Sequence, residues 1–189
     1  RPADFIGILA RPLTRTLEAY SMPRRFPERA DQLSPAPLIR RLVAMLYDGL
    51  ICIALLMVVT MIYTFALAGI LGDEQYKALE AAGQMRGGPL LTSLMFVSLF
   101  LFFGYFWTRT GQTLGMQVWH LRVQNQDGSS ISWLQALLRF MMGWVSWACL
   151  GLGWLWMLFG QERLSWTDRF SESRVYRIPK RYGQEAAGR

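Results

Sequence analysis

The chain has 189 residues, of which 52% are hydrophobic and 17% are charged, and its formal net charge is +7. This composition is more apolar than that of an ordinary soluble domain, and the polar segments between the apolar stretches are too short to bury a core of their own. It therefore excludes a separate soluble domain and predicts a small integral membrane protein. We attribute the basic excess to membrane topology, so we expect the lipid bilayer and no nucleic acid as a partner.

Residues 1–37 form a basic leader. Residues 1–41 contain eight arginines and four acidic residues, a net charge of +4. Apolar residues recur every four positions, which favours a short amphipathic helix at the membrane surface, whereas four prolines between residues 23 and 37 favour a disordered tail, and both interpretations stay open. A cleaved signal peptide is not indicated, because the first apolar run begins about forty residues into the chain. The recurring residues are Phe5, Leu9, Leu13 and Leu17.

Two apolar stretches follow the leader. Residues 42–71 carry one charged side chain, Asp48, and residues 89–108 carry none. A bilayer core about 30 Å thick needs roughly 20 helical residues, so each stretch predicts a transmembrane helix. The connecting residues 72–88 have a net charge of −1, so the positive-inside rule places the leader in the cytoplasm and this loop outside.

Residues 109–132 then lie on the cytoplasmic side. Alternating apolar residues around Leu121 and the turn signal Asp127-Gly128 predict a short strand in a β-hairpin-like loop. Ser132 and Gln135 form a capping-box pattern, which predicts that the next helix begins at residue 133.

The third apolar stretch, residues 133–159, carries a single charge and is divided by Gly151-Leu152-Gly153. Seven basic residues after position 160 favour a cytoplasmic C-terminus. We therefore prefer a re-entrant helical hairpin, with two arms of about 15 residues, over one kinked span. The predicted fold class is an all-α membrane protein with two full transmembrane helices, this third stretch and the short cytoplasmic loop.

Asp48 needs compensation, because a carboxylate within a spanning helix costs about 2.5–3.5 kcal/mol. Arg41 lies seven residues earlier, on the same helical face and about 10 Å nearer the interface. Arg139 has a similar depth in its own helix, so we expect it near Asp48, either paired with it or lining one aqueous pocket. Ala44 and Gly49 are small and would let another helix approach. Whether these charges bind a ligand or only clamp the helices stays open.

Familiar catalytic and metal-binding patterns are not found in the sequence. His120 is the only histidine, and Cys52 and Cys149 lack Cys-x-x-Cys spacing. We expect both cysteines to pack as small apolar residues. We therefore predict no metal, no cofactor and no enzymatic activity.

Four motifs occur in an order that resembles the RDD family of prokaryotic membrane proteins. The resemblance covers roughly residues 38–178 and divides the chain into a leader (1–37), a membrane domain (38–178) and a C-terminal tail (179–189). The family is named for an arginine and two aspartates, which correspond to Arg41, Asp48 and Asp168. From its pattern alone, Asp168 would be a solvated acid among arginines. The resemblance makes it a candidate functional residue. The motifs are Arg41-x-x-Ala44-x-x-x-Asp48-Gly49, Gly111-Gln112-Thr113-x-Gly115-Met116, Leu121-Arg122-Val123, and Asp168-Arg169 followed by Val175.

The resemblance implies transport of small solutes or ions, with sodium/proton exchange assigned to some family members. The corresponding hypothesis is a homo-oligomeric transporter of the bacterial cytoplasmic (inner) membrane. Asp48 would bind a cation or proton, Arg41 and Arg139 would tune it, and Asp168 would lie at the cytoplasmic entrance. The alternative is a non-transporting subunit or assembly protein, in which the charges hold helices together and the tails recruit a membrane-protein partner. The long leader and Glu172 depart from the family pattern.

Overall fold

The computed structural model describes residues 24–28, 30–83, 88–159 and 162–179. The leader helix predicted around residues 5–17, and the tail beyond residue 179, lie outside the described residues.

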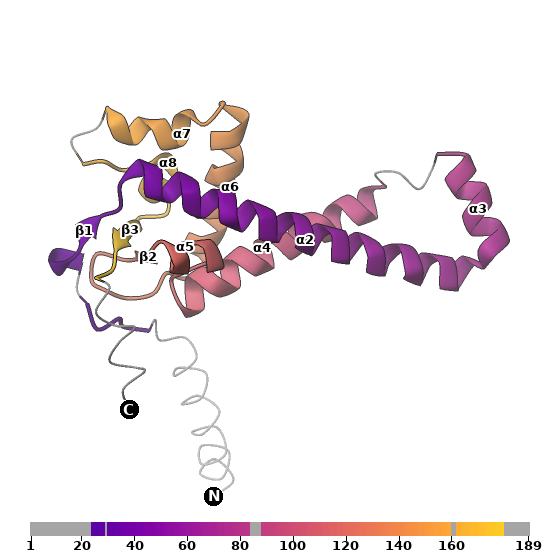
Figure 1. Ribbon diagram of the computed structural model, residues 1–189, viewed down its shortest axis with the longest axis horizontal. Coiled ribbons are helices and arrows are strands. Elements are labelled where there is room, and N and C mark those ends of the chain that lie inside the picture. The colour runs from indigo at the N-terminus through magenta and orange to yellow at the C-terminus, as the bar shows by residue number, and fades with distance from the viewer. Residues whose placement is uncertain (1–23, 29, 84–87, 160–161, 180–189) are drawn as a thin grey trace, which may run out of the picture.

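Two long helices dominate the molecule. Helices α2 (Leu38–Leu71) and α4 (Pro89–Arg109) run antiparallel and side by side, and α3 (Asp73–Ala81) lies at their far end (Figure 1). Both α2 and α4 are long and apolar enough to cross a membrane, which confirms the two predicted spans. The 34 residues of α2 extend about 51 Å, well beyond a 30 Å bilayer core, so one end of the helix can belong to a polar body.

That polar body is built on a small antiparallel sheet. Strands β1 (Ser34–Pro35), β3 (Arg174–Arg177) and β2 (Leu121–Gln124) lie in the order β1-β3-β2. The prediction of an all-α protein was therefore wrong in this detail. The hairpin prediction was also wrong about the partner: residues 125–129 do form a turn, but β2 pairs with β3, about fifty residues later.

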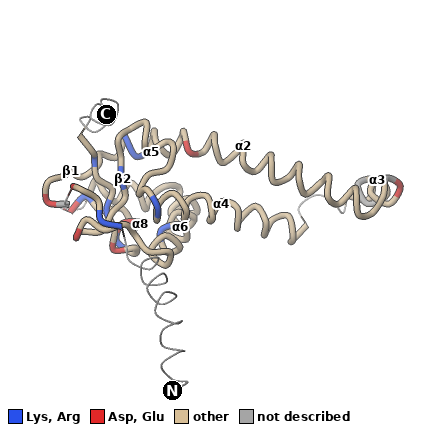
Figure 2. The backbone as a smooth tube through the Cα atoms, turned by 90° about the horizontal axis from the view of Figure 1, so that it is seen from below, with Lys and Arg blue, Asp and Glu red and all other residues tan. Residues whose placement is uncertain are grey.

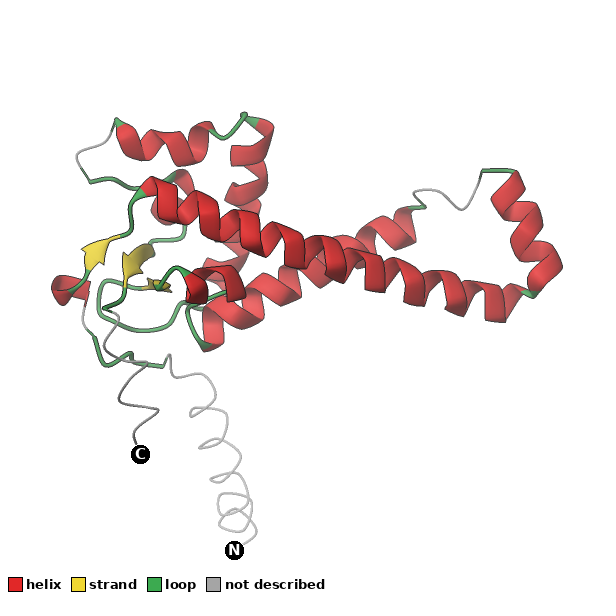
Figure 3. Cartoon of the chain, in the orientation of Figure 1, coloured by secondary structure: helices red, strands yellow, loops and turns green. Residues whose placement is uncertain are grey.

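Pairing of the three strands brings distant segments of the chain to one end of the molecule. β1 precedes α2, β2 follows α4, and β3 is the last described strand. Their pairing brings the segments before α2, after α4 and near the C-terminus to one end of the helix pair, with α3 at the other (Figure 3). Basic residues gather at the sheet end, and α2 and α4 carry almost no charge beyond it (Figure 2).

The third apolar stretch is bent. Helix α6 (Trp133–Ala148) begins at the predicted capping box, and the chain then turns by 107° into the segment Leu152–Leu158, made of α7 (Leu152–Leu155) and the 3-10 helix η2 (Trp156–Leu158). Gly151 makes this turn with φ +84°, which confirms the predicted break. The first arm, α6, has 16 residues, close to the predicted length, but the second has only seven, so the predicted length of the second arm was wrong. A bend of this kind fits either a re-entrant hairpin or one broken span. Helix α6 crosses the α2–α4 pair rather than following it (Figure 1).

Two regions of packing hold the body together. A small apolar core joins the sheet to α2, α6 and the short helix α5 (Leu114–Val118), with Ala44, Met116 and Val123 among its buried residues. Aromatic rings join α4 to α6, where Phe140 contacts Phe96, with ring centroids 5.2 Å apart. Farther out, α2 and α4 expose large apolar side chains, as expected for surfaces that face lipid.

Candidate functional site

Asp168 is buried at the start of the short helix α8 (Trp166–Phe170). The backbone N–H of Asp168 donates to Ser165 Oγ at 3.2 Å, and the backbone N–H of Ser165 donates to Asp168 Oδ2 at 3.3 Å. This reciprocal capping box fixes the carboxylate in place. Only 1% of Asp168 is exposed, so the interpretation of this residue as a solvated surface acid was wrong.

Asp168 joins two arginines from distant parts of the chain. Arg41 Nη1 donates to Asp168 Oδ2, and Arg139 Nη2 donates to Asp168 Oδ1 at 2.8 Å. We call these three residues the Arg41–Asp168–Arg139 cluster. Arg41 also donates to the backbone carbonyls of Ala36 and Val175, both at 3.2 Å. The cluster therefore ties α2, α6 and α8 to strand β3.

The charge state of Asp168 follows from these partners. Burial by itself would raise the pKa of Asp168, but the positive charges of Arg41 and Arg139, and the hydrogen bonds that they donate, lower it to about 2. Asp168 therefore remains ionised throughout the physiological pH range. A group that does not titrate there is a poor proton carrier and a good structural anchor.

We expect acid to weaken the protein through Asp168. Because its folded pKa lies below the ordinary value of 3.8, the carboxylate stabilises the fold fully above about pH 4, and this contribution is lost as the pH falls through about 2. Thermal unfolding in detergent, measured from pH 7 down to pH 2, should show the loss in that acidic window. The Asp168→Asn variant should show a shallower decline there than the wild type. Equal slopes for the two proteins would contradict this assignment.

Asp48 is compensated by hydrogen bonds. Asp48 Oδ2 accepts from the Thr113 hydroxyl at 2.5 Å, and Oδ1 accepts from the Gly115 backbone N–H at 2.8 Å. Thr113 Oγ1 also accepts from the Met116 backbone N–H, so one hydroxyl links the carboxylate to the cap of α5. Among the described residues, no cationic group makes an ion pair with Asp48. Dipoles rather than charges offset its burial.

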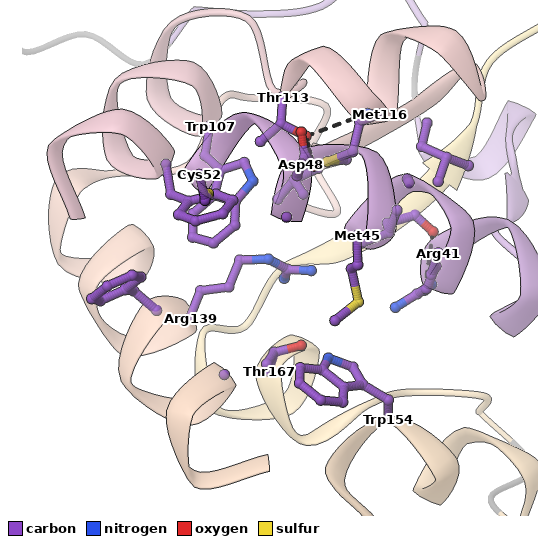
Figure 4. A pocket seen from close by; sticks show the side chains of 18 of the residues that line it. Arg41, Met45, Asp48, Cys52, Trp107, Thr113, Met116, Arg139, Trp154 and Thr167 are labelled. Carbon is purple, nitrogen blue, oxygen red and sulfur yellow. Dashed lines mark hydrogen bonds between the residues drawn. The ribbon is translucent and has the colours of Figure 1, made fainter. Parts of the chain in front are cut away.

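Asp48 and Arg139 nevertheless share a pocket. A cavity of about 480 Å³ lies between α2, α4, α6 and α7, and residues of the sheet and of α5 also line it. Asp48, Arg41 and Arg139 all line it, and Figure 4 shows Asp48 and Thr113 on one side and Arg139 reaching in from another. Of the two predicted arrangements, the structure shows the shared pocket, while the ion pair of Arg139 goes to Asp168.

Two predicted small residues differ in their surroundings. Ala44 is 1% exposed, and its carbonyl lies against Gly115, so this close approach joins α2 to α5. Gly49 faces the pocket instead, and a Cβ added there would meet nothing within 4 Å.

Two other motif residues, Gly111 and Gln112, hold the loop after α4 in place. Gly111 has φ +69°, and a Cβ there would lie 2.6 Å from the Val123 carbonyl oxygen. Gln112 Nε2 donates to the Leu121 carbonyl at 2.7 Å, which fixes this loop against β2. Arg122 is outside the cluster and pairs with Glu28 at 2.6 Å. Arg169 is exposed and does not line the pocket.

Several site residues were missed in the sequence. Ser173 accepts a hydrogen bond from Arg139 Nη1 at 2.9 Å, and Glu28 holds the segment before α2 against the sheet. Nothing in the local sequence around either residue signals these long-range contacts. Ser165 could have been found, because Ser165-x-x-Asp168 is a capping-box spacing.

The fold and the site together define a class of protein. Two apolar helices long enough to span a bilayer, with charged groups buried and compensated at one end, are the features of an integral membrane protein. The model of the RDD family matches residues 35–172, so the chain belongs to the RDD family. No curated protein and no solved structure was found to match it.

Proposed function

We propose that this protein is a small transporter of the bacterial cytoplasmic membrane that moves a small solute or exchanges a cation for a proton. Asp48 is the proposed cation or proton site. The supporting observation is that Asp48 lines the pocket with each carboxylate oxygen accepting one hydrogen bond, which leaves acceptor capacity for a ligand. Asp168, by contrast, is enclosed by two guanidinium groups.

The arginines have a different role in this proposal from the one expected. Arg41 and Arg139 neutralise Asp168 and hold the pocket in shape, rather than pairing with Asp48. The sheet end is the proposed cytoplasmic side, because the basic residues of the described chain gather there (Figure 2). The pocket then lies in the cytoplasmic half of the membrane. The two candidate membrane-spanning helices, α2 and α4, cannot enclose a transport pathway alone, so we propose a homo-oligomer.

One observation favours the alternative, a non-transporting subunit or assembly protein. The Arg41–Asp168–Arg139 cluster is closed by hydrogen bonds to Ser173 and to backbone carbonyls, as a structural clamp would be. Such a protein would use its tails and its exposed apolar helices to bind a membrane partner.

Asp48→Asn separates the two functions. In liposomes containing the purified protein, we expect cation-driven proton flux to fall at least tenfold, because the amide cannot exchange a proton or carry a charge. The fold should survive, since the carbonyl oxygen of the new amide can still accept from Gly115 and its N–H can donate to Thr113.

Glu74→Gln is the matched control, because Glu74 is exposed on α3, at the opposite end from the pocket. Its flux should equal that of the wild type. If Asp48→Asn transports normally, Asp48 is not the site. If the wild type moves none of the ions and solutes offered, and one partner copurifies stoichiometrically, the alternative replaces transport.

A further inference from the structure

The pocket has chemically different ends. The guanidinium groups of Arg41 and Arg139 lie at the end near the sheet. Asp168 sits behind them and offsets only one of their charges, so the Arg41–Asp168–Arg139 cluster has a formal net charge of +1. The opposite walls are apolar and come from α4, α6 and α7, with Leu99, Phe103, Trp144, Trp147 and Trp154.

A hydrogen-bond donor also lacks its acceptor here. Trp107 lines the pocket, and within the described part of the chain its buried indole N–H has no hydrogen-bond partner. The Arg139 guanidinium carbon lies 5.6 Å from the centre of the Trp107 ring. A buried N–H without an acceptor costs about 1–3 kcal/mol, so an oxygen of a ligand would satisfy it beside the arginines.

The apolar part of the pocket has room because glycines line it. A Cβ added at Gly49 on α2 or at Gly143 on α6 would meet nothing within 4 Å. Helices α2 and α6 stand on different sides of this space (Figure 4). Arg41 and Cys52 both line it, and Cys52 lies eleven positions after Arg41 on α2, a rise of about 16 Å. The pocket therefore extends from an interfacial level well into one leaflet.

We propose that the pocket binds an anionic membrane lipid that enters sideways between α2 and α6. Its headgroup oxygens accept from Arg41, Arg139 and the Trp107 N–H, and one acyl chain occupies the space beside Gly49 and Gly143. Guanidinium forks suit phosphate oxygens, and a pocket of this size with apolar walls and a few convergent donors suits a lipid segment. The inference rests on the proposed function in taking this pocket as the solute site.

Asp48 makes the binding sensitive to charge. Its carboxylate lines the same pocket, so in its ionised form it opposes an anionic headgroup. Neutralising Asp48 should therefore strengthen binding of an anionic lipid. The same change would weaken binding of a cation, so Asp48→Asn tests whether the ligand is negatively or positively charged.

The test uses the full chain, purified in a neutral detergent and offered phosphatidylglycerol or phosphatidylcholine with identical acyl chains. Native mass spectrometry counts the lipid retained per chain. We expect phosphatidylglycerol to be retained at least fivefold more than phosphatidylcholine, and Asp48→Asn to widen that ratio. Gly143→Leu fills the pocket and should lower phosphatidylglycerol retention at least tenfold. Gly69→Leu is the matched control on α2, away from the pocket and in open space, and should change nothing.

A second measurement keeps the proposal testable if Gly143→Leu does not fold. In a Cys149→Ser chain, Cys52 is the only thiol, and it lines the pocket. Phosphatidylglycerol should slow its alkylation at least threefold, and phosphatidylcholine should not. Equal retention of both lipids, no effect of Gly143→Leu, or no protection of Cys52 would overturn the proposal.

Failure of this inference differs from failure of the proposed function. Asp48-dependent flux without selective lipid binding leaves transport intact and removes the lipid. Selective lipid binding without any flux removes transport and leaves a lipid-binding membrane protein.

Discussion

Asp168→Asn should unfold the polar body more readily than any other single substitution considered. The asparagine side chain has one carbonyl oxygen, whereas Arg41 and Arg139 each donate to a different oxygen of Asp168. The NH2 group that replaces the second oxygen would point its N–H donors at the N–H donors of a guanidinium group. Arg41 and Arg139 are each only 6% exposed in the native structure. In the variant they would be two buried positive charges without a counterion. Breaking a buried pair from one side costs about 3–5 kcal/mol.

The loss would be measured as the thermal midpoint of unfolding in detergent. At this chain length, 1 kcal/mol corresponds to about 2–4 °C, so we expect a fall of roughly 6 °C or more, or failure to purify folded protein. Glu162→Gln is the control, because Glu162 is 74% exposed at its side chain and lies 3.9 Å from Arg174. Such a surface pair contributes between about 0 and 1 kcal/mol. A midpoint for Asp168→Asn like that of the control would show that the cluster does not anchor the fold.

Gly115→Ala should have the second largest effect. The added Cβ would lie 2.3 Å from the Ala44 carbonyl oxygen and 3.0 Å from Asp48 Cγ. The first of these atoms is backbone, so α5 must move away from α2. The move breaks the 2.8 Å hydrogen bond from the Gly115 N–H to Asp48 and leaves the carboxylate less compensated. Overpacking and the lost hydrogen bond together cost about 2–4 kcal/mol.

Gly69→Ala is the matched comparison for this prediction. Gly69 lies within α2, and a Cβ there would meet nothing within 4 Å. Alanine is favoured over glycine inside a helix by up to about 1 kcal/mol, so Gly69→Ala should leave the midpoint unchanged or raise it. If Gly115→Ala is as stable as Gly69→Ala, the close packing of α5 on α2 is not what holds Asp48.

Local patterns in the sequence determined much of the helical framework. An uninterrupted apolar stretch of about 20 residues has only one stable arrangement in a bilayer, so residues 42–71 and 89–108 predicted their helices. Ser132 and Gln135 marked the start of α6 because both capping groups lie within one turn. Gly151 marked the bend because glycine adopts a positive φ without steric cost. Each of these signals acts over a few residues or along one helix.

The partners of the charged groups were decided only by the tertiary structure. Depth along a helix correctly suggested that Asp48 and Arg139 share a region, but it could not show that Arg139 turns to Asp168. That choice depends on α8 packing against α6, and on strand β3 pairing between β1 and β2. The sheet partners β2 and β3 are about fifty residues apart, and no local periodicity encodes such a pairing. The sequence thus predicted the burial of Asp48 and Arg139, whereas long-range packing buried Asp168 and determined which group compensates each charge.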